Sequence, residues 1–242
     1  MRKSKAFNFG ASLQDRGRYT WFTNSSSCSC AQSHIMVYSV DNFKQDTYVS
    51  RETLDDYIYW YETLCHWNKK INLVSRSTIN SFWERHAYDS WQLVPHIPKK
   101  ANTFLDLGSG AGFPGLSIAI NCKQNARGRV LLVDSVGKKG TFLKKIIRDR
   151  VLPAVVSTKR LERIDNEVYD VISARAFAPL SLLLDYAQRF WGKNTIGLFL
   201  KGESVEEELT TARKKWRFNV EKIKSRSNST GYLLKITELK AR

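Results

Sequence analysis

The segment from Thr103 to Ile120, TFLDLGSGAGFPGLSIAI, most constrains the fold of this chain. Its first five residues predict a short apolar strand, and glycines then occupy every second position from Gly108 through Gly110 to Gly112. Glycine has no Cβ, so the backbone N–H groups of such a loop can approach a ligand closely. The apolar run after Pro114 predicts a helix, since proline is tolerated in a first helical turn. A plain strand-to-helix connection does not need three alternating glycines, so this order predicts a polar-ligand site at the edge of an α/β sheet.

The rest of the chain alternates strand and helix patterns, which predicts a mostly parallel sheet. The fold class expected is α/β: a Rossmann-like seven-stranded sheet over residues 101–242, closed by an antiparallel hairpin. Apolar residues at helical spacing over 50–67, and again after Ser77, predict a small helical cap over residues 47–100. The strands are expected at 103–107, 129–134, 154–157, 169–173, 196–201, 219–224 and 232–238.

Residues 1–46 have a different composition. The first 35 hold seven serines, five basic residues and one acid, without apolar periodicity, so we expect a disordered or loosely attached extension. No apolar segment typical of a signal peptide is present, and the composition fits an organellar transit peptide only in part. A misassigned start codon is the other explanation, because Met36 is the only other methionine. Cys28 and Cys30 with His34 lack a second ligand pair, so we expect no metal site.

The net charge of +16 is the strongest signal in the composition. A globular domain this basic usually binds a polyanion, most often nucleic acid, although a generally basic proteome would give the same value. No run approaches the roughly 18 apolar residues of a membrane span. Four scattered cysteines imply no disulfide framework and favour a reducing compartment. We therefore expect a cytoplasmic, monomeric protein with a nucleic-acid partner and no membrane partner.

Asp134 follows the second apolar strand, where a carboxylate can accept hydrogen bonds from both ribose hydroxyls of a nucleoside. Gly110-x-Gly112-x-x-Gly115 also fits the dinucleotide fingerprint, so NAD remains an alternative ligand. The acid–glycine pattern from Asp106 to Gly112 suits S-adenosylmethionine better. Loop amides and a basic group can meet the carboxylate of that cofactor, and an acid or carbonyls can meet its ammonium. The closing hairpin, in place of a second nucleotide-binding half, favours the same cofactor.

Two basic side chains are expected at the carboxyl edge of the sheet. Arg175 follows the fourth strand and Lys201 ends the fifth, where each can pair with a carboxylate or phosphate. Both are candidates for positioning rather than for covalent catalysis. Further basic residues are candidate phosphate contacts: Lys138, Lys139, Lys144, Lys145, Arg148 and those between Arg213 and Arg226.

Several motifs in order resemble the glucose-inhibited division protein B family, the ribosomal RNA small subunit methyltransferases G. They are DLGSGAGFPG at 106–115, DSVGKKGTFL at 134–143 and ISARA at 172–176. Flanking pairs match as well: Trp67-Asn68 before Asn72-Leu73, His86 with Asp89-Ser90, and Lys201-Gly202. The resemblance covers residues 50–238. It implies methyl transfer from S-adenosylmethionine to N7 of a guanine in small-subunit ribosomal RNA.

The resemblance implies cofactor contacts at Gly108, Phe113, Leu161, Glu162 and Arg175. Ser109 and Ala111 stand where the family often has Thr and Pro, and both are small enough for the same backbone path. Guanine N7 has a free lone pair and no proton, so an in-line displacement needs positioning and electrostatics more than a general base. The remaining alternatives are a NAD-dependent oxidoreductase and a non-catalytic RNA-binding module.

Overall fold

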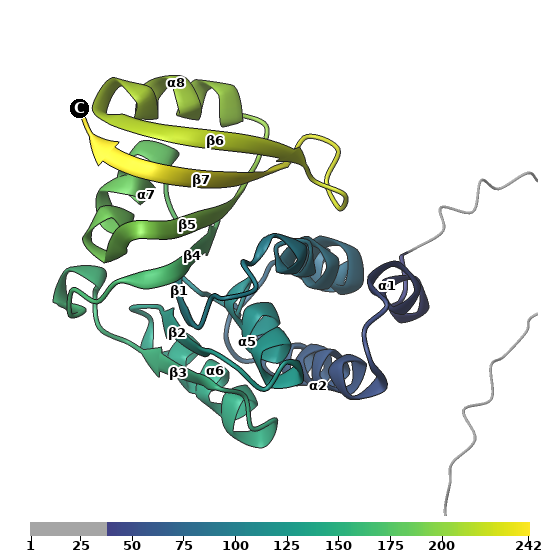
Figure 1. Cartoon of the computed structure of the whole chain (residues 1–242). Coiled ribbons are helices and arrows are strands. Elements are labelled where there is room, and N and C mark those ends of the chain that lie inside the picture. The colour runs from purple at the N-terminus through teal and green to yellow at the C-terminus, as the bar shows by residue number, and fades with distance from the viewer. Residues whose placement is uncertain (1–37) are drawn as a thin grey trace, which may run out of the picture. The chain divides into compact units, whose positions relative to one another are not determined.

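The computed structural model describes residues 38–242, which fold around one seven-stranded sheet (Figure 1). The strand order is β3-β2-β1-β4-β5-β7-β6. The first five strands are parallel, and β7 pairs antiparallel with both β5 and β6. The order reverses at β1 and β4, which places a ligand crevice at their carboxyl ends. The strand bounds are β1 Thr103–Leu107, β2 Arg129–Val133, β3 Ala154–Ser157, β4 Tyr169–Arg175, β5 Trp191–Lys201, β6 Trp216–Lys224 and β7 Tyr232–Ala241.

Helices cover both faces of the sheet because successive strand side chains point to opposite faces. On β1, Phe104 packs into one core while Leu105 packs into the other. The first core includes α2, α5 and α6, and the second includes α7 and α8. The helices that follow β1, β2, β4 and β5 are α5 Gly115–Gln124, α6 Gly137–Asp149, α7 Leu180–Ala187 and α8 Val205–Lys215, with short 3-10 turns η3 Leu161–Arg163 and η4 Gln188–Phe190.

The helical cap packs against α5 and α6 through the long helix α2 (Figure 1). Trp60 of α2 is fully buried, and its Nε1–H donates to the Ala111 carbonyl of the glycine loop at 3.1 Å. The cap therefore supports the loop from beneath. Its elements are α1 Val40–Thr47, α2 Arg51–Asn68, α3 Arg76–Ile79, the π-helix η1 Trp83–Tyr88, α4 Asp89–Trp91 and the 3-10 turn η2 Val94–His96.

The structure differs from the sequence predictions in several places. Strand β6 begins at Trp216 rather than at residue 219, since Trp216 pairs with Ala241 of β7, and β4 and β7 extend to Arg175 and Ala241. Residues 40–46, predicted to belong to the loose extension, form helix α1, because Ser39 makes a capping box and Phe43 is fully buried. The helix predicted after Ser77 is divided into α3, η1 and α4. Strand β5 begins at Trp191 rather than at residue 196, since its first residues pair with Tyr169 before a bulge.

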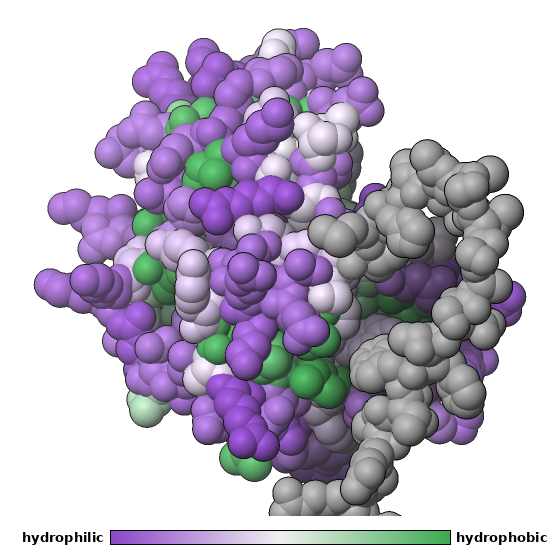
Figure 2. Space-filling model, turned by 90° about the vertical axis from the view of Figure 1, so that its right-hand side faces the viewer, coloured by the Kyte–Doolittle hydropathy of each residue, from purple (hydrophilic) through white to green (hydrophobic). Residues whose placement is uncertain are grey.

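Four residues discussed in the sequence analysis lie outside the described residues: Cys28, Cys30, His34 and Met36. Among residues 38–242, no helix is both long and apolar enough to cross a membrane. The face that carries the cap is mostly hydrophilic where the described residues are visible, with smaller apolar groups between them (Figure 2).

Candidate active site

Two cavities lie along the carboxyl edge of β1, β4 and β5. The first, here called the loop cavity, has a volume of about 420 Å³ and lies between the glycine loop and the ends of β2 and β3. The second, the hairpin cavity, has about 500 Å³ and lies between the cap and the β6–β7 turn. Ala176 and Phe177 line both cavities. The two spaces therefore meet at the segment that follows β4.

The glycine loop adopts a path that side chains would obstruct. Gly108, Gly110 and Gly112 have φ angles of +69°, +57° and +104°, a region that L residues rarely adopt. A Cβ at Gly108 would lie 2.3 Å from the ring of Phe177, and one at Gly112 would lie 2.4 Å from Leu116. Gly110 is open on its Cβ side. Only Gly108 of the three lines the loop cavity, so Gly110 and Gly112 shape the loop rather than that wall.

Asp134 holds the loop and the start of α6 together. Its carboxylate accepts the Gly110 N–H at 2.8 Å and the Val136 N–H at 2.9 Å, and the Lys139 ammonium lies 3.9 Å away. Asp134 lines the loop cavity although only 8% of the residue is exposed. Each carboxylate oxygen can accept a second hydrogen bond, so acceptor capacity remains toward the cavity.

Leu161 and Glu162 form another wall of the loop cavity, in the 3-10 turn after β3. Leu161 is buried, whereas the Glu162 carboxylate is exposed and accepts from the Tyr186 hydroxyl at 3.3 Å. The structure thus brings four predicted residues to one cavity: Gly108, Asp134, Leu161 and Glu162.

Phe113 lines neither cavity. Its ring is stacked between Trp60, 4.7 Å away, and His86, 4.5 Å away, measured between ring centroids. The Arg175 guanidinium also lies 4.8 Å from its centroid. Phe113 is therefore an internal support that joins the loop to the cap and to Arg175.

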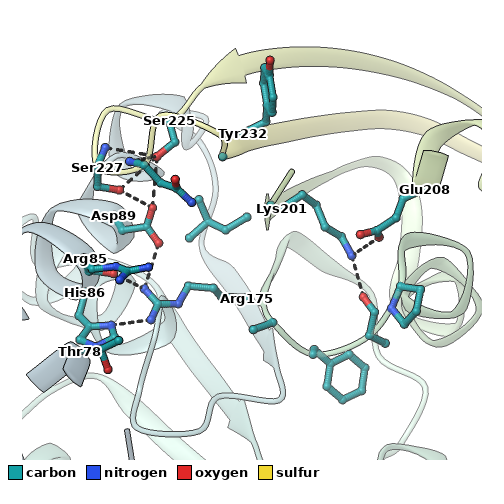
Figure 3. A pocket seen from close by; sticks show the side chains of 18 residues that line it. Thr78, Arg85, His86, Asp89, Arg175, Lys201, Glu208, Ser225, Ser227 and Tyr232 are labelled. Carbon is teal, nitrogen blue, oxygen red and sulfur yellow. Dashed lines mark hydrogen bonds and ion pairs between the residues drawn. The ribbon is translucent and has the colours of Figure 1, made fainter. Parts of the chain in front are cut away.

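Arg175 is the last residue of β4 and lines the hairpin cavity rather than the loop cavity (Figure 3). Nη1 donates to the Arg85 carbonyl at 2.8 Å and to Asp89 at 3.0 Å, and Nη2 lies 2.5 Å from Nδ1 of His86. Burial lowers the pKa of Arg175, and Asp89 opposes that effect. A guanidinium has five N–H groups, so these three contacts leave two for a ligand.

Asp89 connects Arg175 to the β6–β7 turn. One of its oxygens accepts from Ser227 at 2.7 Å and from Gln92 at 2.8 Å, while the other accepts from Arg175. The turn is thereby fixed to the cap. No local pattern in the sequence signals this contact, because Asp89 and Ser227 are 138 residues apart.

Lys201 lies on the other side of the hairpin cavity (Figure 3). Its ammonium donates to Glu208 at 2.6 Å and to the Ala178 carbonyl at 2.6 Å, and only 8% of its side chain is exposed. Glu208 also accepts the Leu180 N–H at 2.6 Å. Lys201 therefore fixes the β4–α7 segment to α8.

Asp106 and His86 are buried titratable groups beside the site. Asp106 is fully buried beneath the loop, where burial raises its pKa to about 6, and Ser173 donates to it at 2.7 Å. Burial, followed by the charge of Arg175, lowers the pKa of His86 to about 3, so the ring is neutral. Asp106 lines neither cavity. Among residues 38–242, no group of His, Cys, Asp or Glu side chains is arranged to hold a metal ion.

Comparison with known proteins gives one consistent result. Residues 52–232 match the family described as rRNA small subunit methyltransferase G. The chain is 46% identical to ribosomal RNA small subunit methyltransferase G of Hyphomonas neptunium, over 80% of this chain and 92% of that protein. The corresponding protein of Parvibaculum lavamentivorans is 43% identical over 84% of this chain and 91% of its own length.

Solved structures show the same fold at low sequence identity. A TehB-like SAM-dependent methyltransferase from Corynebacterium glutamicum superimposes with a TM-score of 0.51 at 16% identity, covering 76% of this chain and 97% of that chain. A SAM-dependent methyltransferase from Aquifex aeolicus gives 0.50 at 14% identity, covering 62% and 90%. The predicted Rossmann-like architecture with its antiparallel hairpin is confirmed.

Proposed function

The chain belongs to the ribosomal RNA small subunit methyltransferase G family, and we propose that its two cavities divide the reaction between them. The loop cavity holds S-adenosylmethionine. The hairpin cavity receives a guanine of small-subunit ribosomal RNA, whose N7 is methylated. The observation that carries this division is that the cavities meet at Ala176 and Phe177, so that a donor in one and an acceptor in the other face each other there.

The residues of the loop cavity fit S-adenosylmethionine. Gly108 has no Cβ, which lets the Phe177 ring pack directly on the loop backbone at the cavity wall. Asp134 offers acceptors to ribose hydroxyls, and Leu161 with Glu162 offers an apolar surface and an acceptor for the adenine edge. Arg175 lies outside this cavity, in the wall of the hairpin cavity, and its two remaining N–H groups can meet the cofactor carboxylate only where the two cavities adjoin. When bound, the cofactor supplies a sulfonium methyl group as the electrophile.

The chain supplies position and electrostatic stabilisation. Guanine N7 loses no proton when it is alkylated, so no general base is required. Neither of the two buried titratable groups suits that role. His86 lines the hairpin cavity, but its low pKa makes it a weak base and its Nδ1 faces Arg175. Asp106 lines neither cavity. Arg175 and Lys201 are each held by ion pairs that orient the cavity walls. A rigid wall that holds the acceptor nitrogen in line with the methyl group raises the rate of transfer through proximity and orientation.

A basic surface at the open end of the hairpin supports RNA binding. It consists of six exposed residues, and of these only Lys215 has an ion-pair partner among the described residues, Asp185 at 2.8 Å. On α6, by contrast, Lys139 pairs with Asp134, and Lys145 and Arg148 both pair with Asp149. The hairpin surface therefore has more uncompensated charge for phosphates. Its members are Arg213, Lys214, Lys215, Arg217, Lys240 and Arg242.

The organisation of the enzyme is part of the same proposal. Residues 47–100 act as the cap, residues 101–242 bind the cofactor, and residues 1–46 are an N-terminal extension. The enzyme acts as a monomer. A ribosomal RNA substrate supports a cytoplasmic location. Light scattering of the purified protein tests the monomer.

The test is methyl transfer to small-subunit RNA and to small subunits from a strain that lacks this gene. Mass spectrometry of the RNA should show one added methyl group on a guanine N7 with the wild-type protein and none with Arg175→Ala. S-adenosylhomocysteine should raise the melting temperature and NAD should not. Stabilisation by NAD alone would favour an oxidoreductase, and RNA binding without methyl transfer would favour a non-catalytic module.

A further inference from the structure

The segment between Arg175 and Leu180 contributes Ala176 and Phe177 to the walls of both cavities, and its ends are fixed. Arg175 is bound to Asp89 and to His86, as described above. At the other end, the Ala178 carbonyl accepts from Lys201 and the Leu180 N–H donates to Glu208. Between these anchors, Ala176 is exposed and has a φ of +49°, which reverses the chain direction. This turn carries the Phe177 side chain to the junction of the cavities.

Phe177 is the only aromatic residue among the described ones that lines both cavities. Its ring is half-buried and packs against Gly108, where an added Cβ would lie 2.3 Å from Cδ2. Tyr186 forms a T-shaped pair with it, with 5.6 Å between ring centroids. In such a pair the edge of one ring meets the face of the other, so Tyr186 covers at most one face of the Phe177 ring.

The other aromatic side chains near the site are less suited to hold a base. Phe113 is covered on both faces by Trp60 and His86. Tyr186 lines only the loop cavity, and its hydroxyl is bound to Glu162. Tyr232 lines only the hairpin cavity, and the Lys222 ammonium lies 6.0 Å from its centroid. Phe177 alone contacts the space for the cofactor and the space for the substrate.

We propose that Phe177 is the stacking platform for the unstacked target purine, which it holds against the cofactor at the junction of the cavities. This inference rests on the proposed function. An N7 methyl transfer requires the base plane to be fixed while its N7 edge stays free of hydrogen bonds, and a ring face provides this. A base removed from RNA loses stacking worth a few kcal/mol, which an aromatic ring partly replaces.

The test compares four variants at this position and beside it. Phe177→Leu keeps apolar volume against Gly108 but removes the flat face, whereas Phe177→Tyr keeps both. Tyr232→Leu probes the rival ring, and Leu182→Ala, an exposed apolar position on α7, is a matched surface control. Each is measured for its single-turnover methyl transfer to unmethylated small-subunit substrate, its dissociation constant for S-adenosylhomocysteine and its melting temperature.

We expect Phe177→Leu to lower the single-turnover rate roughly 5- to 150-fold, the range for loss of one base–aromatic stack. Its affinity for S-adenosylhomocysteine should change by less than about twofold, while Phe177→Tyr and Leu182→Ala keep most of the rate. Tyr232→Leu alters the wall of the hairpin cavity and should lower the rate less than Phe177→Leu does. A fully active Phe177→Leu, a parallel loss of cofactor affinity or a larger loss in Tyr232→Leu would overturn the assignment. If the wild-type protein transfers no methyl group, the proposed function fails instead.

Discussion

The loop cavity and the hairpin cavity are adjacent and similar in size, but they are built differently. The loop cavity depends on backbone N–H groups and on Asp134, which binds the loop only 24 residues away along the chain. The hairpin cavity depends on side chains from distant segments, such as Asp89 with Ser227 and Arg175 with Asp89. In the proposed function the loop cavity binds the cofactor. The hairpin cavity joins cap, sheet and hairpin, so the proposed substrate site exists only when all three are assembled.

This difference predicts that the largest single effect arises in the hairpin cavity. Arg175→Ala removes one partner from a largely buried pair, and Asp89 is left without its cation. We expect the free energy of unfolding to fall by about 3–5 kcal/mol and methyl transfer to be lost. Urea denaturation and transfer assays measure both. Arg175→Lys keeps the charge without the planar fork and should recover only part of the loss. Full stability of Arg175→Ala would show that the ion pair between β4 and the cap does not stabilise the fold.

Asp134→Ala tests the loop cavity in the same way. The substitution removes the acceptor for Gly110 and Val136 and the proposed ribose ligand. Affinity for S-adenosylhomocysteine should fall roughly 10- to 150-fold, since a hydrogen bond to a charged group contributes about 1.5–3 kcal/mol. Titration calorimetry gives the constant, with Asp134→Asn as the variant that retains one acceptor. An unchanged affinity would contradict the ribose assignment.

Substitutions at two glycines of the loop distinguish the effect of backbone strain from the effect of the contact with Phe177. Gly108 and Gly110 both have positive φ, but only Gly108 lies against Phe177. Gly110→Ala should cost about 1–2 kcal/mol of unfolding free energy from the left-handed conformation alone. Gly108→Ala should cost more and should also slow methyl transfer, because Phe177 must move. If both variants lose the same free energy of unfolding in urea denaturation, the contact between Gly108 and Phe177 does not affect stability.

The smallest effect concerns His86 and pH. Burial holds its pKa at about 3 in the folded protein, whereas an unfolded histidine titrates near 6.5. Between these values the unfolded chain binds a proton that the folded chain does not, so stability decreases as pH falls through this window. The wild-type protein should therefore lose more stability than His86→Gln between pH 7 and pH 4.5. Asp106 is present in both proteins, so its own titration cancels in the comparison. If the difference in unfolding free energy between the two proteins does not change over this pH range, the pKa of His86 is not lowered by folding.

The sequence by itself determined the loop cavity. The alternation of Gly108, Gly110 and Gly112 after an apolar strand, with Asp134 after the next, predicted this loop and its acid, and the family resemblance added Leu161 and Glu162 in the same cavity. These signals are local because strand, turn and helix patterns depend on near neighbours. The same patterns predicted the mostly parallel sheet and its closing antiparallel hairpin.

Only the tertiary structure decided the hairpin cavity. The sequence marked Arg175 and Lys201 as ligand-edge cations, but not that Asp89 and Glu208 bind them, nor that Phe113 is enclosed by Trp60 and His86. It left the aromatic partner of the base unnamed, and the structure singles out Phe177 by where the two cavities meet. These contacts depend on how the elements pack against one another, and no local periodicity encodes that packing.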